Sequence, residues 1–204
     1  MSTARDTILS RVQSALAKLP QRAPMPAWTD QVLAARTAAT GRDLWPLFAE
    51  RLSGVHGTPL ADVSALRAFL AGHGCTQGYC DPRLIDQVRA AIDPSVVLSA
   101  TFERSRFDEY QFGITLADGA IAETGTVILT DTNTPNRLAA LAPWIHVAVV
   151  KASTLHPDLP AAVAAMPKDP NVIWVTGPSK TADVEGILIE GVHGPGIQAA
   201  LLLE

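Results

Sequence analysis

The stretch Val172-Ile173-Trp174-Val175-Thr176-Gly177-Pro178-Ser179-Lys180-Thr181-Ala182-Asp183-Val184-Glu185 carries the strongest indication of the fold. An apolar, β-branched run ends abruptly in Gly-Pro-Ser, and hydroxyl, ammonium and carboxylate groups follow directly. This pattern is typical of α/β proteins, in which a buried strand fixes the backbone and the loop after it carries the chemistry. It predicts a buried strand over 172–176 that leads into a functional loop.

Helical and strand-like segments alternate around this stretch. The strand 113–117 leads through Asp118-Gly119, a strong turn signal that predicts a hairpin and so some antiparallel pairing. The alternation predicts an α/β fold, a three-layer α/β/α sandwich with a mainly parallel (mixed) sheet. The expected helices cover 3–19, 29–53, 62–71, 84–91, 137–141 and 160–166, and the expected strands cover 96–98, 113–117, 120–129, 145–150, 172–176, 187–190 and 199–203.

The first 26 residues are expected to form an N-terminal helical arm. Apolar residues recur at helical spacing over 3–19, and Thr3 could cap this helix. Pro20, Pro24 and Pro26 end it and predict a stiff linker. The predicted organisation is therefore a helix and Pro-rich linker over 1–26, followed by one α/β domain over 27–204.

Composition limits the class of protein. Of the 204 residues, 48% are hydrophobic and 18% are charged, which favours one well-packed domain. The net charge is −4 and no segment concentrates Lys and Arg with aromatic residues, so no nucleic-acid partner is expected. No apolar run approaches the roughly 20 residues of a membrane span. Because Arg5 and Asp6 interrupt the start, we expect no signal peptide and a cytoplasmic location.

Two cysteines, Cys75 and Cys80, lie in a segment over 74–82 that we expect to be a loop. A zinc or iron–sulfur site commonly needs about four ligands, and the sequence offers no second closely spaced pair. We therefore expect ordinary reduced thiols and no cofactor bound by this chain.

The loop after residue 176 superficially suggests a phosphate-binding loop. That motif needs Gly directly before Lys and another Gly five positions earlier, whereas Ser179 and Trp174 hold those positions here. Two interpretations stay open. Ser179, Thr181 and Lys180, with Gly177 before them, could bind an anionic group. Alternatively, a hydroxyl caps a turn and Lys180 lies in solvent.

Acidic residues follow this loop. Asp183 and Glu185, with Glu190 and His193, could form an oxygen-rich metal site. Carboxylates in such positions more often complement a helix dipole or form salt bridges, so no metal is expected. Asp183 and Glu185 are instead expected among the residues that bind the substrate.

His193 lies in Gly191-Val192-His193-Gly194-Pro195. Glycines allow the backbone to approach a ligand closely, and histidine gains or loses a proton near neutral pH. A loop histidine that only bonds a carbonyl group is the alternative. The enclosing Gly and Pro favour a site, with His193 as an acid or base and Gly194 in contact with substrate.

Glu123-Thr124-Gly125-Thr126 places a carboxylate and two hydroxyls around a glycine within an apolar stretch. Glu123 could act as a base or nucleophile, with Thr124, Gly125 and Thr126 beside the substrate. A β-bulge at Gly125, with both threonines satisfying local backbone groups, explains the residues equally well.

Together these patches resemble a known family. The blocks Ala-Glu-Thr-Gly-Thr (122–126), Gly-Pro-Ser-Lys-Thr-Ala-Asp-Val-Glu (177–185) and Gly-Val-His-Gly-Pro (191–195) are similar, in order and spacing, to those of the LUD domain. The most similar group is the lactate-utilisation protein C (LutC, or YkgG) family. The resemblance covers most of the chain and implies a fold like that of the NagB/RpiA/CoA-transferase group.

The resemblance also implies a function. The chain would be a subunit or accessory protein in the oxidation of L-lactate to pyruvate, alongside two iron–sulfur partner proteins of the same operon that hold the clusters. The family supplies no established catalytic residue, so the roles of Glu123 and His193, and of a small anionic ligand, are inferred from the residues. The alternative is a stand-alone enzyme that binds a CoA thioester or a sugar phosphate, with Glu123 as nucleophile or base.

Overall fold

The computed structural model describes residues 3–18, 40–134, 136–166, 168–183 and 185–203. Contacts divide the chain into two compact units, Met1–Ala35 and Arg36–Glu204. In the first unit, α1 spans Ala4–Leu16 and every described residue of this unit is exposed. Thr3 caps α1 as expected, since its hydroxyl accepts a hydrogen bond from the Asp6 N–H while Asp6 accepts from the Thr3 N–H. The predicted linker and domain boundary lie outside the described residues.

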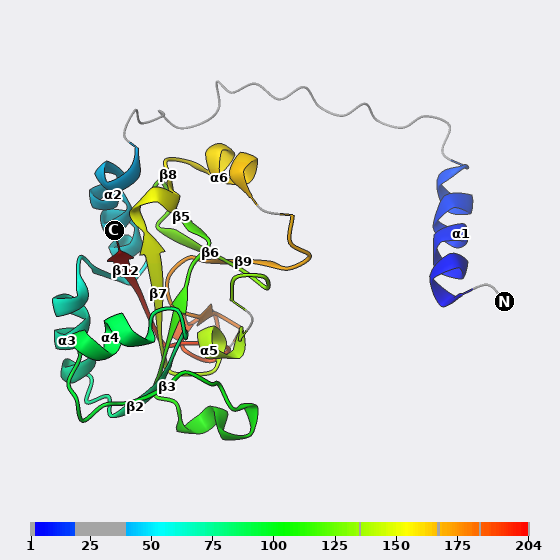
Figure 1. Cartoon of the computed structure of the whole chain (residues 1–204). Helices are drawn as coiled ribbons and strands as arrows, with labels where there is room; N and C mark the ends of the chain where they lie inside the picture. Colours follow the sequence, from blue (N-terminus) through cyan, green and yellow to red (C-terminus); the bar gives the residue numbers. More distant parts are fainter. Residues whose placement is uncertain (1–2, 19–39, 135, 167, 184, 204) are drawn as a thin grey trace. The chain divides into compact units, whose positions relative to one another are not determined.

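The second unit contains the remaining elements (Figure 1). Its helices are α2 (Trp45–Gly54), α3 (Val63–Gly72), α4 (Ile85–Ala91), α5 (Leu138–Leu141) and α6 (Leu159–Ala165), with short 3₁₀ segments η2 (Gly41–Leu44), η3 (Arg104–Glu109) and η4 (Ala152–Thr154). Its strands are β1 (Thr58–Leu60), β2 (Gln77–Cys80), β3 (Val97–Ser99), β4 (Phe112–Leu116), β5 (Gly119–Ile121), β6 (Thr126–Thr130), β7 (Ile145–Lys151), β8 (Leu155–His156), β9 (Val172–Val175), β10 (Lys180–Thr181), β11 (Ile189–Glu190) and β12 (Ile197–Leu203).

Six of the described strands form one sheet in the order β1-β12-β7-β4-β2-β3, and all its pairings are parallel. The central strands β4, β7 and β12 are almost entirely buried, which a parallel sheet covered on both faces requires. A second sheet, β8-β5-β6-β9, contains the antiparallel pairings of β6 with β5 and β9. The prediction of an α/β fold with a mainly parallel sheet is confirmed.

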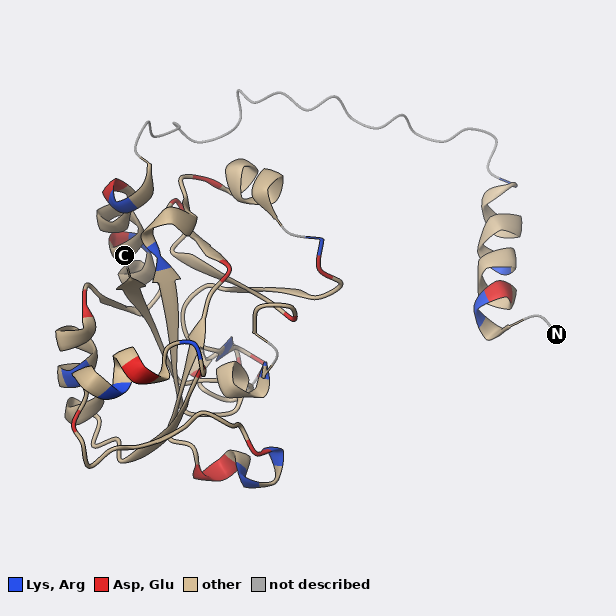
Figure 2. Ribbon diagram, in the orientation of Figure 1, with Lys and Arg blue, Asp and Glu red and all other residues tan. Residues whose placement is uncertain are grey.

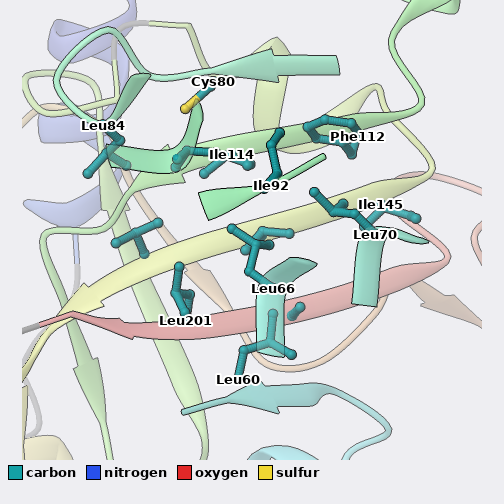
Figure 3. Packing of buried hydrophobic residues seen from close by; sticks show 14 of the residues in the cluster. Leu60, Leu66, Leu70, Cys80, Leu84, Ile92, Phe112, Ile114, Ile145 and Leu201 are labelled. Carbon is teal, nitrogen blue, oxygen red and sulfur yellow. The ribbon is translucent and has the colours of Figure 1, made fainter. Parts of the chain in front are cut away.

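Helices α3 and α4 pack on one face of the large sheet, and Figure 3 shows buried apolar side chains of this layer. Their residues Leu66, Leu70 and Val88 pack on Phe112 and Ile114 of β4, and all five side chains are buried. Asp62 starts α3, because its carboxylate accepts a hydrogen bond from the Ala65 N–H at 2.8 Å.

The other face packs against α2, α5 and the second sheet. Phe48 and Leu52 of α2 form a buried cluster with Val127 and Leu129 of β6, and each of these four side chains is less than 1% exposed. The opposite side of β7 faces this second core through Val150. The large sheet therefore lies between two apolar layers, which fixes the loops at its ends.

Three local expectations are wrong. The hairpin expected at Asp118-Gly119 is absent, because β4 continues past it into β5. The Asp118 carboxylate instead accepts hydrogen bonds from the N–H and the hydroxyl of Thr130. The reversal comes over 122–125, where Gly125 has φ +65°. The segment 74–82 is not a loop but contains the buried strand β2. The strand expected to be buried over 172–176, β9, is an edge strand, which leaves Trp174 38% exposed.

Candidate functional site

A pocket of about 280 Å³ lies between α5, the end of β9 and the start of β12. It brings together two of the three blocks identified in the sequence. Gly177 and Ser179 line it from the loop after β9, and His193 and Gly194 line it from the loop before β12. The other lining residues are Ala140, Leu141, Ile173, Trp174, Val175, Thr176, Pro178, Pro195 and Gln198.

Backbone hydrogen bonds join the two loops into one unit. The Ser179 N–H donates to the Pro195 carbonyl at 2.9 Å, and the Gly191 N–H donates to the Ser179 carbonyl at 2.9 Å. Beyond them, β10 and β11 form a short antiparallel ladder. A Cβ atom on Gly194 would lie 3.2 Å from the Ser179 Cβ, so glycine at this position allows the loops to close together.

The third block reaches the pocket through a row of hydroxyls. The Thr124 and Thr126 hydroxyl oxygens are 2.7 Å apart, and Thr126 is 2.8 Å from the hydroxyl of Thr176, which lines the pocket. Gly125 turns the chain against α2, where a Cβ atom would lie 2.4 Å from the Leu52 nitrogen. The block 122–126 therefore contributes support behind the pocket wall.

Glu123 does not line this pocket. Its carboxylate accepts a weak hydrogen bond from the Leu159 N–H at 3.5 Å, and its own N–H donates to the Pro157 carbonyl at 3.1 Å. These contacts place Glu123 at the first turn of α6, where a carboxylate satisfies an otherwise unpaired N–H. The geometry gives it a role in starting a helix.

Lys180 does not line the pocket. Its ammonium donates to the Val55 carbonyl at 2.6 Å and lies 3.7 Å from the Glu190 carboxylate. The same carboxylate is 2.7 Å from Nδ1 of His56. Carbonyl groups at the C-terminal end of a helix lack partners within the helix and bind cations favourably. The Lys180 ammonium therefore links the β10–β11 ladder to the C-terminal end of α2.

The acidic residues after Lys180 face solvent. The Thr181 hydroxyl donates a hydrogen bond to the carboxylate of Asp183, and both Asp183 and Glu185 are exposed, the latter with φ +55°. In the described part of the chain, no group of three or more His, Cys, Asp or Glu side chains is placed to hold a metal ion.

A buried polar row that the sequence reasoning missed lies behind the pocket. His146 is fully buried in β7, with Nδ1 2.8 Å from the Gln198 side-chain oxygen and Nε2 2.9 Å from the Thr115 hydroxyl. The Gln198 amide nitrogen donates to the Ala199 carbonyl, so its oxygen accepts from Nδ1–H and the Thr115 hydroxyl donates to Nε2. Burial lowers the pKa of His146 to about 4, so the ring is neutral near pH 7. The available signal was a polar residue within each of three apolar strands, β4, β7 and β12.

No described helix combines the length and apolarity that a bilayer crossing would need.

Comparisons with known proteins agree with this architecture. The family model described as LUD domain matches residues 86–203, which include all three blocks. A solved structure, a DUF162 family protein from Deinococcus radiodurans, has a TM-score of 0.57 at 18% identity, covering 81% of this chain and 100% of that one. This likeness concerns the fold.

Several curated relatives bear the name lactate utilization protein C. The Bacillus licheniformis protein is 36% identical over 107 residues, covering 48% of this chain and 45% of the relative. The Halalkalibacterium halodurans protein is 38% identical over 96 residues, covering 43% and 42%, and the Bacillus subtilis protein is 34% identical over 104 residues, covering 47% and 43%. The matched part spans less than half the length of these relatives. Since the family model covers more than half of the chain, the chain belongs to the LUD domain family.

Proposed function

We propose that this chain acts in lactate utilisation, as a cytoplasmic ligand-binding subunit of a system that oxidises L-lactate to pyruvate. Membership of the LUD domain family and the similarity to proteins named lactate utilization protein C support the proposal. In this proposal, two iron–sulfur proteins encoded in the same operon are the partners, and they carry the clusters.

The observation that carries the proposal is the convergence of two blocks on one small pocket. Thr176, Ser179 and His193 are polar side chains at its wall, and Gln198 connects it to the buried His146. Ligand pockets typically combine apolar walls with a few placed polar groups, and this one is slightly smaller than their usual range of about 300–1,000 Å³. A short hydroxy acid such as lactate suits this size and polarity.

Oxidation of lactate removes the hydroxyl proton and a hydride equivalent from the carbinol carbon. In the proposed arrangement His193 accepts the hydroxyl proton, and the hydride equivalent leaves to an acceptor on a partner protein. The Thr176 and Ser179 hydroxyls donate to the lactate carboxylate. Lys180 takes no part in this arrangement, because it does not line the pocket and its ammonium bonds the Val55 carbonyl.

The cysteines support placing the clusters elsewhere. Cys75 and Cys80 are free thiols, both buried, and burial raises the pKa of Cys80 to about 12. A cluster ligand must be a thiolate, which this environment disfavours. We therefore propose that the chain binds no cofactor of its own.

Growth on L-lactate tests the proposal. A strain lacking this gene is complemented with the wild-type chain, with His193→Gln, or with His73→Gln as a matched control outside the pocket. We expect wild type and His73→Gln to restore growth and His193→Gln to restore it poorly while remaining folded. If all three complemented strains grew equally well, His193 would have no role in the mechanism. If the strain without the gene grew on L-lactate, the chain would not be needed for lactate utilisation.

A further inference from the structure

A second pocket, distinct from the one described above, lies on the other side of α5. It has a volume of about 490 Å³ and is lined by Phe102, Arg104, Asn136, Arg137, Leu138 and Leu141. Leu141 lines both pockets, so the two are neighbours without sharing polar residues. None of the three blocks contributes to this second pocket.

Two guanidinium groups define the chemistry of this pocket. Arg104 forms no hydrogen bond or ion pair with any residue that the structure describes. Arg137 is held by Asp131, with Nε 2.7 Å from a carboxylate oxygen, which leaves its terminal nitrogens available. Over the rest of the domain acidic and basic residues are interspersed (Figure 2). Among the described residues, the lining of this pocket contains two arginines and no acidic residue.

The geometry of arginine favours an anion with several oxygens. One guanidinium satisfies a carboxylate by two parallel hydrogen bonds, whereas a phosphate offers enough oxygens for two arginines and an amide. Asn136 supplies the amide, and its nitrogen also donates to the Tyr79 hydroxyl at 3.3 Å, which holds the side chain in place. These groups match a phosphate monoester better than a single carboxylate.

The rest of the pocket wall is apolar and partly aromatic. The Phe102 ring stacks on Tyr110 with centroids 4.7 Å apart, and meets Tyr79 edge-on at 5.7 Å. Phe102 is therefore fixed in orientation, with the exposed Leu138 and Leu141 side chains lining the same pocket. Such a wall suits a planar, weakly polar ring.

We propose that this pocket binds a nucleoside phosphate, with the phosphate between Arg104 and Arg137 and the base against Phe102 and the leucines. The proposal is independent of the proposed function in lactate utilisation, because it uses a different pocket and different residues.

Binding of AMP to the full-length chain, measured by calorimetry and by thermal shift, tests it. Arg104→Gln should weaken AMP binding by roughly tenfold or more, because a charge-assisted hydrogen bond is lost. Arg67→Gln, an exposed arginine on α3 at the opposite face of the sheet, is the matched control and should bind AMP like wild type. Adenosine and inorganic phosphate are the partial ligands, and each should bind more weakly than AMP.

Several outcomes would overturn the proposal. The proposal is wrong if the wild-type chain does not bind AMP, or if Arg104→Gln binds AMP as tightly as wild type. It is also wrong if Arg67→Gln loses as much AMP affinity as Arg104→Gln. Adenosine binding as tightly as AMP would exclude the phosphate contact. Inorganic phosphate binding as tightly as AMP would exclude the contact with the base. The variants replace exposed side chains, and a thermal unfolding curve checks that each is folded.

Discussion

Replacing Gly125 with alanine should destabilise the protein strongly, because the β5–β6 turn packs directly on the backbone of α2. Gly125 has φ +65°, and a Cβ atom there would lie 2.4 Å from the Leu52 nitrogen and 2.6 Å from the Arg51 carbonyl carbon. Both contacts are with backbone atoms of a helix, which cannot rotate away. The turn or the helix must therefore shift.

Two contributions determine the expected loss of unfolding free energy in Gly125→Ala. The left-handed conformation costs a non-glycine residue about 1–2 kcal/mol, partly offset by about 0.4–1 kcal/mol from the stiffer unfolded chain. Overpacking adds typically about 1–3 kcal/mol, and contacts this short against backbone favour the upper end. We expect Gly125→Ala to lower the free energy of unfolding by about 3 kcal/mol, and the melting temperature by about 6–12 °C.

Gly74 provides a matched control. It also has φ +65°, but a Cβ atom there would meet nothing within 4 Å. Gly74→Ala therefore carries only the conformational term, and we expect a loss of about 1 kcal/mol or less. Denaturant unfolding followed by circular dichroism measures both variants. If Gly125→Ala lost no more stability than Gly74→Ala, the proposed packing of the turn on α2 would be wrong.

Three further predictions concern buried and half-buried groups. Burial lowers the pKa of His146 to about 4 from 6.5, so the unfolded chain binds the extra proton: stability is complete above about pH 6.5 and falls by about 3 kcal/mol as the pH drops to 4. Denaturant midpoints from neutral to acidic pH check this, and the same slope in His146→Gln would refute it. Cys75 and Cys80 should react slowly with a thiol reagent at about pH 8 and rapidly in denaturant, since burial raises the pKa of both thiols; fast labelling of the native protein would contradict their burial. Asp118→Ala should cost about 1–3 kcal/mol in unfolding free energy, because the N–H and hydroxyl of Thr130 lose their acceptor, and an unchanged midpoint would show that water replaces the carboxylate.

Periodicity and capping predicted most elements of the second unit, because they are local properties. Asp62 marks the start of α3, and the apolar run at 145–150 marks a central strand. Which strands pair with one another could not be predicted, because strand pairing depends on residues far apart in the sequence. Asp118 resembles a turn residue, but its side chain bonds Thr130 on β6, and the chain reverses only at 122–125.

The candidate site divides in the same way. Gly177 and His193 were identified from their local sequence, and the structure brings them to one pocket. The contacts of Lys180 could not be anticipated, since its partner Val55 lies 125 residues earlier. The same holds for His146, whose partners Thr115 and Gln198 are 31 and 52 residues away.

Reconstitution of lactate oxidation tests the central claim most directly. The two iron–sulfur proteins proposed as partners are purified, and the lactate-dependent reduction of an artificial electron acceptor is measured with and without this chain. We expect reduction to require the wild-type chain, to persist with His73→Gln and to fall with His193→Gln. A rate that is the same with and without the chain would contradict its proposed role.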